Sequence, residues 1–211
     1  MKSDQNIEDL KQIRSLMERS SKFLSLSGFS GIAAGVIALV GAAIAYFVIF
    51  EQGAVKYDEH MRALGGGSTA SIRFRMAALA ASILVCAVSA AWYFSSRKAR
   101  QTGMRLWTST ARRTLYHFLI PLVAGGVFCI ALVANNNVHL VGSATLVFYG
   151  LALVNSGKFT VDEVHYLGLS EIALGLLAGF LLNYGLLFWA LGFGVMHIIY
   201  GIRMHNKYDR K

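Results

Sequence analysis

Long apolar stretches, separated by short charged or polar segments, dominate the pattern of this chain. Six stretches are long enough to cross a bilayer as helices, because about 17 to 25 helical residues, rising about 1.5 Å each, cover a hydrocarbon core of roughly 30 Å. Flanking charges set their limits at residues 23–50, 76–94, 115–134, 138–154, 166–183 and 185–202. We therefore expect an all-α integral membrane protein in which six transmembrane helices form three hairpins.

The segment before the first stretch has the pattern of a short amphipathic helix. Ile7, Leu10, Ile13 and Met17 recur every three or four residues and form one apolar stripe. A helix of this kind typically lies in the membrane interface, although it could also dock a partner or form a dimer. We expect a cytoplasmic amphipathic segment over residues 1–22, the transmembrane bundle over 23–203 and a basic cytoplasmic tail over 204–211.

The composition agrees with a membrane protein. Hydrophobic residues make up 55% of the 211 positions and charged residues only 15%, against about 25% in a typical soluble domain. The chain carries 20 Lys and Arg and 11 Asp and Glu, a net charge of +9. Because the basic residues lie between apolar stretches, we expect membrane lipids with anionic headgroups as partners, and no nucleic acid.

The distribution of Lys and Arg predicts the orientation. Sixteen of the 20 lie on the side of the predicted bundle that carries both chain ends, and the other side carries only Lys56, Arg62, Arg73 and Arg75. Since the side richer in Lys and Arg is normally cytoplasmic, both termini are expected in the cytoplasm, with the bacterial inner membrane as the expected location.

The second predicted loop, residues 95–114, contains six basic residues and no acid. A basic segment of this kind can rest on anionic lipid, or it can serve only to fix the topology. The candidate lipid contacts are Arg97, Lys98, Arg100, Arg105, Arg112 and Arg113.

Two ionisable residues fall inside the last two apolar stretches at matching depth. Glu171 lies 13 residues before the turn at Tyr184 and His197 lies 13 residues after it, so both are expected about 20 Å from that turn. Ionisable groups inside a membrane are candidates for functional sites. Tyr149, Ser30, Ser89 and His117 reach a similar depth, and the set could be a structural network, a ligand or ion site, or a catalytic site.

Pairs of glycines mark two helix faces that allow close approach. Gly31 and Gly35 form one such pair and Gly175 and Gly179 the other. Faces of this type pack helices within one chain or between subunits, so a homo-oligomer could form through either face.

The chain contains no metal-binding HExxH or CxxC pattern, no Walker loop and no dinucleotide fingerprint, so neither a metal nor a cofactor is expected. The string Gly28-Phe29-Ser30-Gly31, together with His197, resembles the serine motif and histidine of rhomboid intramembrane proteases. Rhomboids carry that serine in the fourth of six spans, whereas here it lies in the first.

These patterns favour a non-catalytic multi-pass membrane protein that acts in binding, sensing or assembly. One alternative is a carrier or channel for a small solute or ion that uses the polar layer. A second alternative is an intramembrane enzyme that uses Glu171 and His197, with or without a metal ion.

Overall fold

The computed structural model describes residues 27–49, 70–103 and 107–209, and helices make up nearly all of these segments. No strand occurs in them, which confirms the expected all-helical class. The amphipathic segment predicted over residues 1–22, the first predicted loop and Arg105 lie outside the described residues. The elements are α2 (Gly28–Ile44), η1 (Ala45–Ile49), α4 (Ala70–Gln101), α5 (Ser109–Ala134), η3 (Val138–Leu140), α6 (Val141–Gly157), α7 (Asp162–Phe180), η4 (Leu182–Tyr184), α8 (Gly185–Trp189), η5 (Ala190–Met196), α9 (His197–Met204) and η6 (His205–Asp209).

The last four elements follow one another directly from Gly185 to Asp209, and we call them together the C-terminal helix. Within the described residues, five helices are long and apolar enough to cross a membrane: Gly28–Val48, Arg73–Gln101, Ser109–Ala134, Val138–Gly157 and Leu182–Asp209. The remaining long helix, α7, has Asp162 and Glu163 in its first turn and Glu171 in its middle. This architecture is compatible with a multi-pass helical membrane protein.

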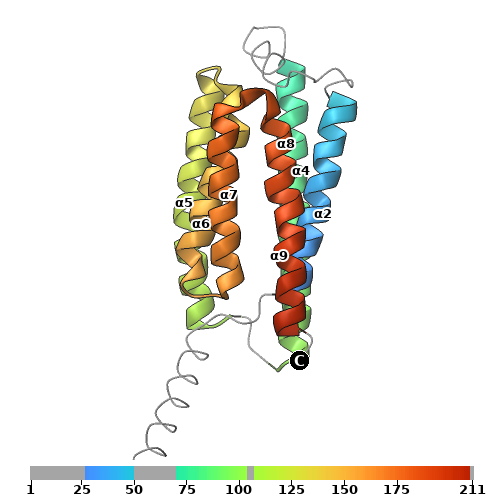
Figure 1. The fold of residues 1–211 in the computed structure, drawn as a ribbon, viewed down its shortest axis with the longest axis vertical. Helices are drawn as coiled ribbons and strands as arrows, with labels where there is room; N and C mark the ends of the chain where they lie inside the picture. Colours follow the sequence, from blue (N-terminus) through green and yellow to red (C-terminus); the bar gives the residue numbers. More distant parts are fainter. Residues whose placement is uncertain (1–26, 50–69, 104–106, 210–211) are drawn as a thin grey trace, which may run out of the picture.

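The described helices form two groups that lie side by side along their length (Figure 1). One group contains α2, α4 and the C-terminal helix, and the other contains α5, α6 and α7. α6 and α7 run antiparallel, because Gly150 faces Gly168 while Val147 faces Gly175 further along. The hydroxyl of Ser143 donates to the Gly175 carbonyl at 2.6 Å and ties the same pair together.

Glycines also allow α2 and the C-terminal helix to touch along their backbones. A side chain at Gly35 would collide with the Gly194 carbonyl, and one at Gly201 would collide with the backbone of Ile32. Both glycine faces singled out in the sequence, Gly31/Gly35 and Gly175/Gly179, are therefore packed against helices of the same chain. A homo-oligomer would need another surface.

Several helices extend beyond the apolar stretches that predicted them. α4 continues to Gln101 and α5 begins at Ser109, so the second loop is much shorter than residues 95–114. α7 begins at Asp162, and the predicted tail is helical as far as Asp209. Hydropathy marks where apolar side chains stop, but a helix can continue into the interface, where long basic side chains reach water. At α5 the start is fixed by Thr108, whose hydroxyl accepts a hydrogen bond from the Ala111 amide at 3.1 Å.

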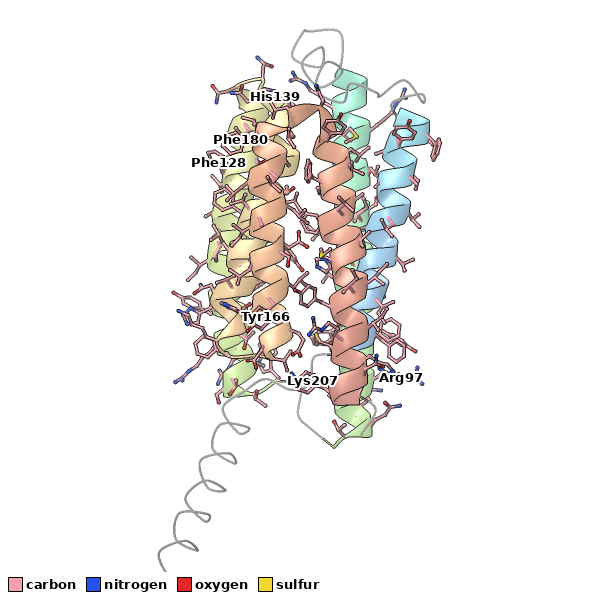
Figure 2. All side chains as sticks on the ribbon, viewed as in Figure 1. Arg97, Phe128, His139, Tyr166, Phe180 and Lys207 are labelled. Carbon is pink, nitrogen blue, oxygen red and sulfur yellow. The ribbon has the colours of Figure 1, made fainter. Side chains whose placement is uncertain are left out.

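The basic residues gather at one end of the bundle, which we call the basic end: there α4, α6 and the C-terminal helix finish and α5 and α7 begin. Arg97 and Lys207 lie at this end and His139 at the other (Figure 2). Between the ends, the outer faces of α4 and α5 expose large apolar side chains, among them Leu84, Val85, Val88, Val123, Val127 and Ile130. Outward-facing apolar side chains of this density are typical of helices in contact with lipid.

Candidate functional site

Three of the residues predicted from depth meet in the interior between the two groups. Glu171 comes from the middle of α7, His197 from the first position of α9 and Tyr149 from α6. Glu171 Oε1 lies 3.2 Å from His197 Nδ1, and the Tyr149 hydroxyl lies 2.9 Å from His197 Nε2. Glu171 is 0% exposed and His197 is 5% exposed. We call these three residues the polar cluster.

A stretch of π-helix leads directly into the histidine. In η5, residues Ala190–Met196, the backbone leaves the regular α-helical pattern, and the carbonyl of Gly192 lies 3.1 Å from His197 Nδ1. A carbonyl can only accept, so the hydrogen sits on Nδ1 and, in neutral imidazole, Nε2 accepts from the Tyr149 hydroxyl. An imidazolium would reverse that second bond, because the phenol oxygen can also accept. π-Bulges in helices frequently occur at functional sites.

The carboxyl of Glu171 lies in a buried and tightly filled space. Gly192 provides the room, since a side chain there would collide with Glu171 Oε2 and with Leu146, which is itself 0% exposed. Within the described residues neither carboxyl oxygen has a hydrogen bond, and the imidazole Nδ1 of His197 lies 3.2 Å from Oε1. Burying a carboxyl group without hydrogen bonds is costly, so the contact with the imidazole matters for the stability of this site.

Aromatic rings enclose the imidazole and the phenol. The Phe193 ring centre lies 5.0 Å from that of Tyr149 and 5.9 Å from that of His197, while Phe118 meets Tyr149 edge-on at 5.9 Å. Trp189 lies 5.0 Å from Phe193 on the same helix. These rings pack against both side chains and restrict their orientation.

The other residues predicted for the polar layer lie apart from the cluster. The Ser30 hydroxyl donates to the Ser27 carbonyl within the first turn of α2, so Ser30 and His197 do not form the pair that the rhomboid-like string would require. Ser89 is exposed on α4. His117 stacks on Phe159 at 4.9 Å near the start of α5. Depth along a helix fixes the level of a side chain but not the direction in which it points.

At the basic end, Asp209 holds the start of α2 in place. Its Oδ2 accepts from the Gly28 amide at 2.9 Å and from the Ser27 hydroxyl at 3.3 Å, and its Oδ1 lies 2.7 Å from Lys98 Nζ. A carboxylate is well placed at a helix N-terminus, where free amides and the helix dipole favour negative charge. Lys98 therefore serves an internal ion pair rather than acting as a free lipid contact. Of the other predicted lipid contacts, the structure describes four, all exposed: Arg97, Arg100, Arg112 and Arg113.

A second ion pair at this end joins the two groups. Lys207 Nζ donates to Glu163 Oε1 at 2.8 Å, which links η6 to the first turn of α7. Burial alone would raise the pKa of the Glu163 carboxyl, but hydrogen bonds from Lys207 and Tyr208 outweigh it, and the pKa lies below its usual value. Sequence reasoning missed both ion pairs. The pair of Lys98 and Asp209 could have been suspected from the sequence, because Asp209 is an acid in an otherwise basic tail.

Within the described part of the chain, no group of three His, Cys, Asp or Glu side chains is close enough to hold a metal ion. No family model, no curated protein and no solved structure matches the chain. Function must therefore be argued from the polar cluster itself.

Proposed function

We propose that this protein is a non-catalytic membrane protein of the sensing class, in which the polar cluster joins the two helix groups and a signal is transmitted when that contact loosens. The observation that carries the proposal is the Glu171 carboxyl, which is 0% exposed and lies 3.2 Å from His197 Nδ1.

The cost of burying the two groups explains why their contact matters. A carboxyl and an imidazole that leave water lose their hydration, and each offsets part of this cost for the other when they lie together. Moving the groups apart inside the bundle therefore leaves each without its partner.

The placement of the cluster supports a mechanical consequence. Tyr149 and Glu171 belong to the group of α5, α6 and α7, whereas His197 belongs to the other group. Their contact crosses the joint between the groups, so losing this contact weakens that joint. A shift between the groups is a change that a soluble or membrane partner can recognise at the basic end.

The proposal includes a topology and a location. Both termini lie in the cytoplasm, residues 1–22 lie on the cytoplasmic surface as an amphipathic helix, and the host membrane is the bacterial inner membrane. The excess of Lys and Arg on one side supports this arrangement. Reporter fusions at Gly103 and after Lys211 should report cytoplasm, and a fusion at Gly66 should report the outside. A cytoplasmic signal at Gly66 would overturn the six-span topology.

The test of the sensing function is a double-mutant cycle. The variants are Glu171→Leu, His197→Leu and the double variant, followed by thermal unfolding in detergent. Each single change strands a buried polar partner and should cost about 3–5 kcal/mol, while the double variant should recover much of this loss. The double variant should therefore cost less than either single change, so the coupling energy should exceed about 3 kcal/mol. Additive single effects would exclude the proposed pair.

A carrier is the second candidate, and the π-helix η5 favours it. Irregular backbone beside polar groups, at the joint between two helix groups, is a recurring feature of transporters. In liposomes of purified protein, a proton flux that disappears in Glu171→Gln would favour the carrier. No flux, together with a strong coupling energy between Glu171 and His197, would favour the sensor.

A further inference from the structure

A pocket of about 370 Å³ opens at the basic end, away from the polar cluster. Its walls are Glu163 in the first turn of α7 and Arg203, Asn206 and Lys207 on the C-terminal helix. The last three recur at spacings of three and four residues, so they lie on one helix face. The pocket therefore lies where the two helix groups meet at the end of the bundle.

The charges of this pocket leave one positive charge without a counter-ion. Glu163 neutralises Lys207 through the 2.8 Å ion pair and holds that ammonium at the pocket wall. Arg203 has no acidic partner among the described residues; its guanidinium lies 5.9 Å from the centre of the Tyr200 ring. The lining thus has two cations, one anion and an exposed amide, which together suit a ligand with a single negative charge and further polar groups.

The surroundings indicate where such a ligand comes from. Tyrosine and tryptophan side chains are exposed near this end of the bundle: Trp92, Tyr93, Trp107, Tyr116 and Tyr166. Rings of this kind favour the headgroup level of a membrane. Basic pockets between transmembrane helices at that level commonly bind phospholipid headgroups.

We propose that the pocket holds the phosphate of an anionic phospholipid whose headgroup carries one negative charge and free hydroxyls. Arg203 and Lys207 bind the phosphate oxygens, and the Asn206 amide accepts from or donates to the headgroup hydroxyls. Arg203 is also exposed but, unlike the arginines predicted as lipid contacts, it lines this pocket. The site depends on the proposed membrane placement but not on the contact within the polar cluster, since Glu163 and Glu171 are eight residues and thus about 12 Å apart along α7.

The experiment uses the full chain, stripped of lipid in a neutral detergent, with native mass spectrometry and thermal unfolding as readouts. The probes are dioctanoyl-phosphatidylglycerol, dioctanoyl-phosphatidylcholine and inorganic phosphate. Phosphatidylglycerol should bind in preference to phosphatidylcholine and raise the unfolding temperature. Arg203→Gln should weaken its binding about five- to tenfold, and Asn206→Asp, an exposed change of the same size, should weaken it as well.

The matched control is Arg113→Gln, which removes an exposed arginine from α5 at the same end and should leave binding nearly unchanged. Equal weakening by Arg113→Gln and Arg203→Gln would mean a diffuse basic surface and overturn the pocket. If inorganic phosphate stabilises the protein as much as phosphatidylglycerol does, the ligand is free phosphate and the lipid assignment is overturned. Binding of phosphatidylcholine as tight as that of phosphatidylglycerol would overturn it too. Glu171→Gln should retain lipid binding, so a failure of the sensing proposal leaves this result intact.

Discussion

At the scale of single residues, the candidate site depends on Gly192, which has no side chain. The carboxyl of Glu171 and the side chain of Leu146 fill the volume that any larger residue would need. The same glycine supplies the carbonyl that His197 Nδ1 contacts at 3.1 Å. One small residue therefore shapes both the space around the acid and the orientation of the imidazole.

Replacing Gly192 with alanine should destabilise the protein by about 1–3 kcal/mol, because the new methyl group overpacks a filled interior. It should also reduce the coupling between Glu171 and His197. Thermal unfolding of the purified variant measures the first effect. The control is Gly126→Ala on α5, where an added side chain meets nothing within 4 Å and should stabilise the helix by up to about 1 kcal/mol. Equal changes in unfolding temperature for Gly192→Ala and Gly126→Ala would contradict the tight packing around Gly192.

The sequence could predict how deep these residues lie along their helices, but not which side chains they contact. A fixed rise per residue placed Glu171 and His197 at one depth, and the structure brings them together. The same reasoning placed Ser89 at that depth, yet it lies exposed on α4. The rotation of each helix depends on packing against its neighbours, which here is set by glycines such as Gly35 and Gly201.

At the scale of elements, hydropathy located each described helix but misjudged where most of them end. The charged ends of α4, α7 and the C-terminal helix carry ion pairs that extend the helices past their apolar parts. The π-helix η5 left no hydropathy signal, because its residues are as apolar as those of a regular span. Backbone irregularity of this kind follows from tertiary contacts rather than from composition.

The ion pair between η6 and α7 should make stability depend on pH in the acid range. Since the pKa of Glu163 is lowered in the folded protein, its ionised form stabilises the fold above the ordinary glutamate value of about 4.3. That contribution is lost as the pH falls through the lowered value. Lys207→Met should therefore lower the unfolding temperature at pH 7, and its difference from the unmodified protein should shrink in acid.

Lys158→Met is the control for this pair, because Lys158 is an exposed lysine at the same end with no acidic partner among the described residues. It should change the unfolding temperature little at either pH. If the unfolding temperature of Lys207→Met stays below that of the unmodified protein by the same amount down to strongly acid pH, Glu163 is not the partner of Lys207.

At the scale of the whole molecule, side-chain contacts among the described residues join the two helix groups at several levels. Near the end opposite the basic end, the Arg73 guanidinium donates to the Asn136 side chain at 2.9 Å. The polar cluster joins the groups in the interior, and the Glu163–Lys207 pair joins them at the basic end. The close connection from α7 through η4 to α8 keeps the far end together, so separation is expected at the basic end (Figure 1).

The central claim is that the polar cluster keeps the two helix groups together, and a distance measurement across the basic end tests it most directly. Spin labels at Tyr166→Cys on α7 and Ile202→Cys on the C-terminal helix, both exposed positions, are placed in a chain with Cys86→Ser and Cys129→Ser. Pulsed electron paramagnetic resonance then gives the distance distribution in this labelled chain, and in the same chain with Glu171→Leu, His197→Leu or both.

The labelled chain should show one narrow distribution, and a second, longer distance should appear in Glu171→Leu and in His197→Leu. The double variant should return towards the narrow distribution, because two apolar side chains can pack where the polar pair was buried. An unchanged distribution in both single variants would contradict the account.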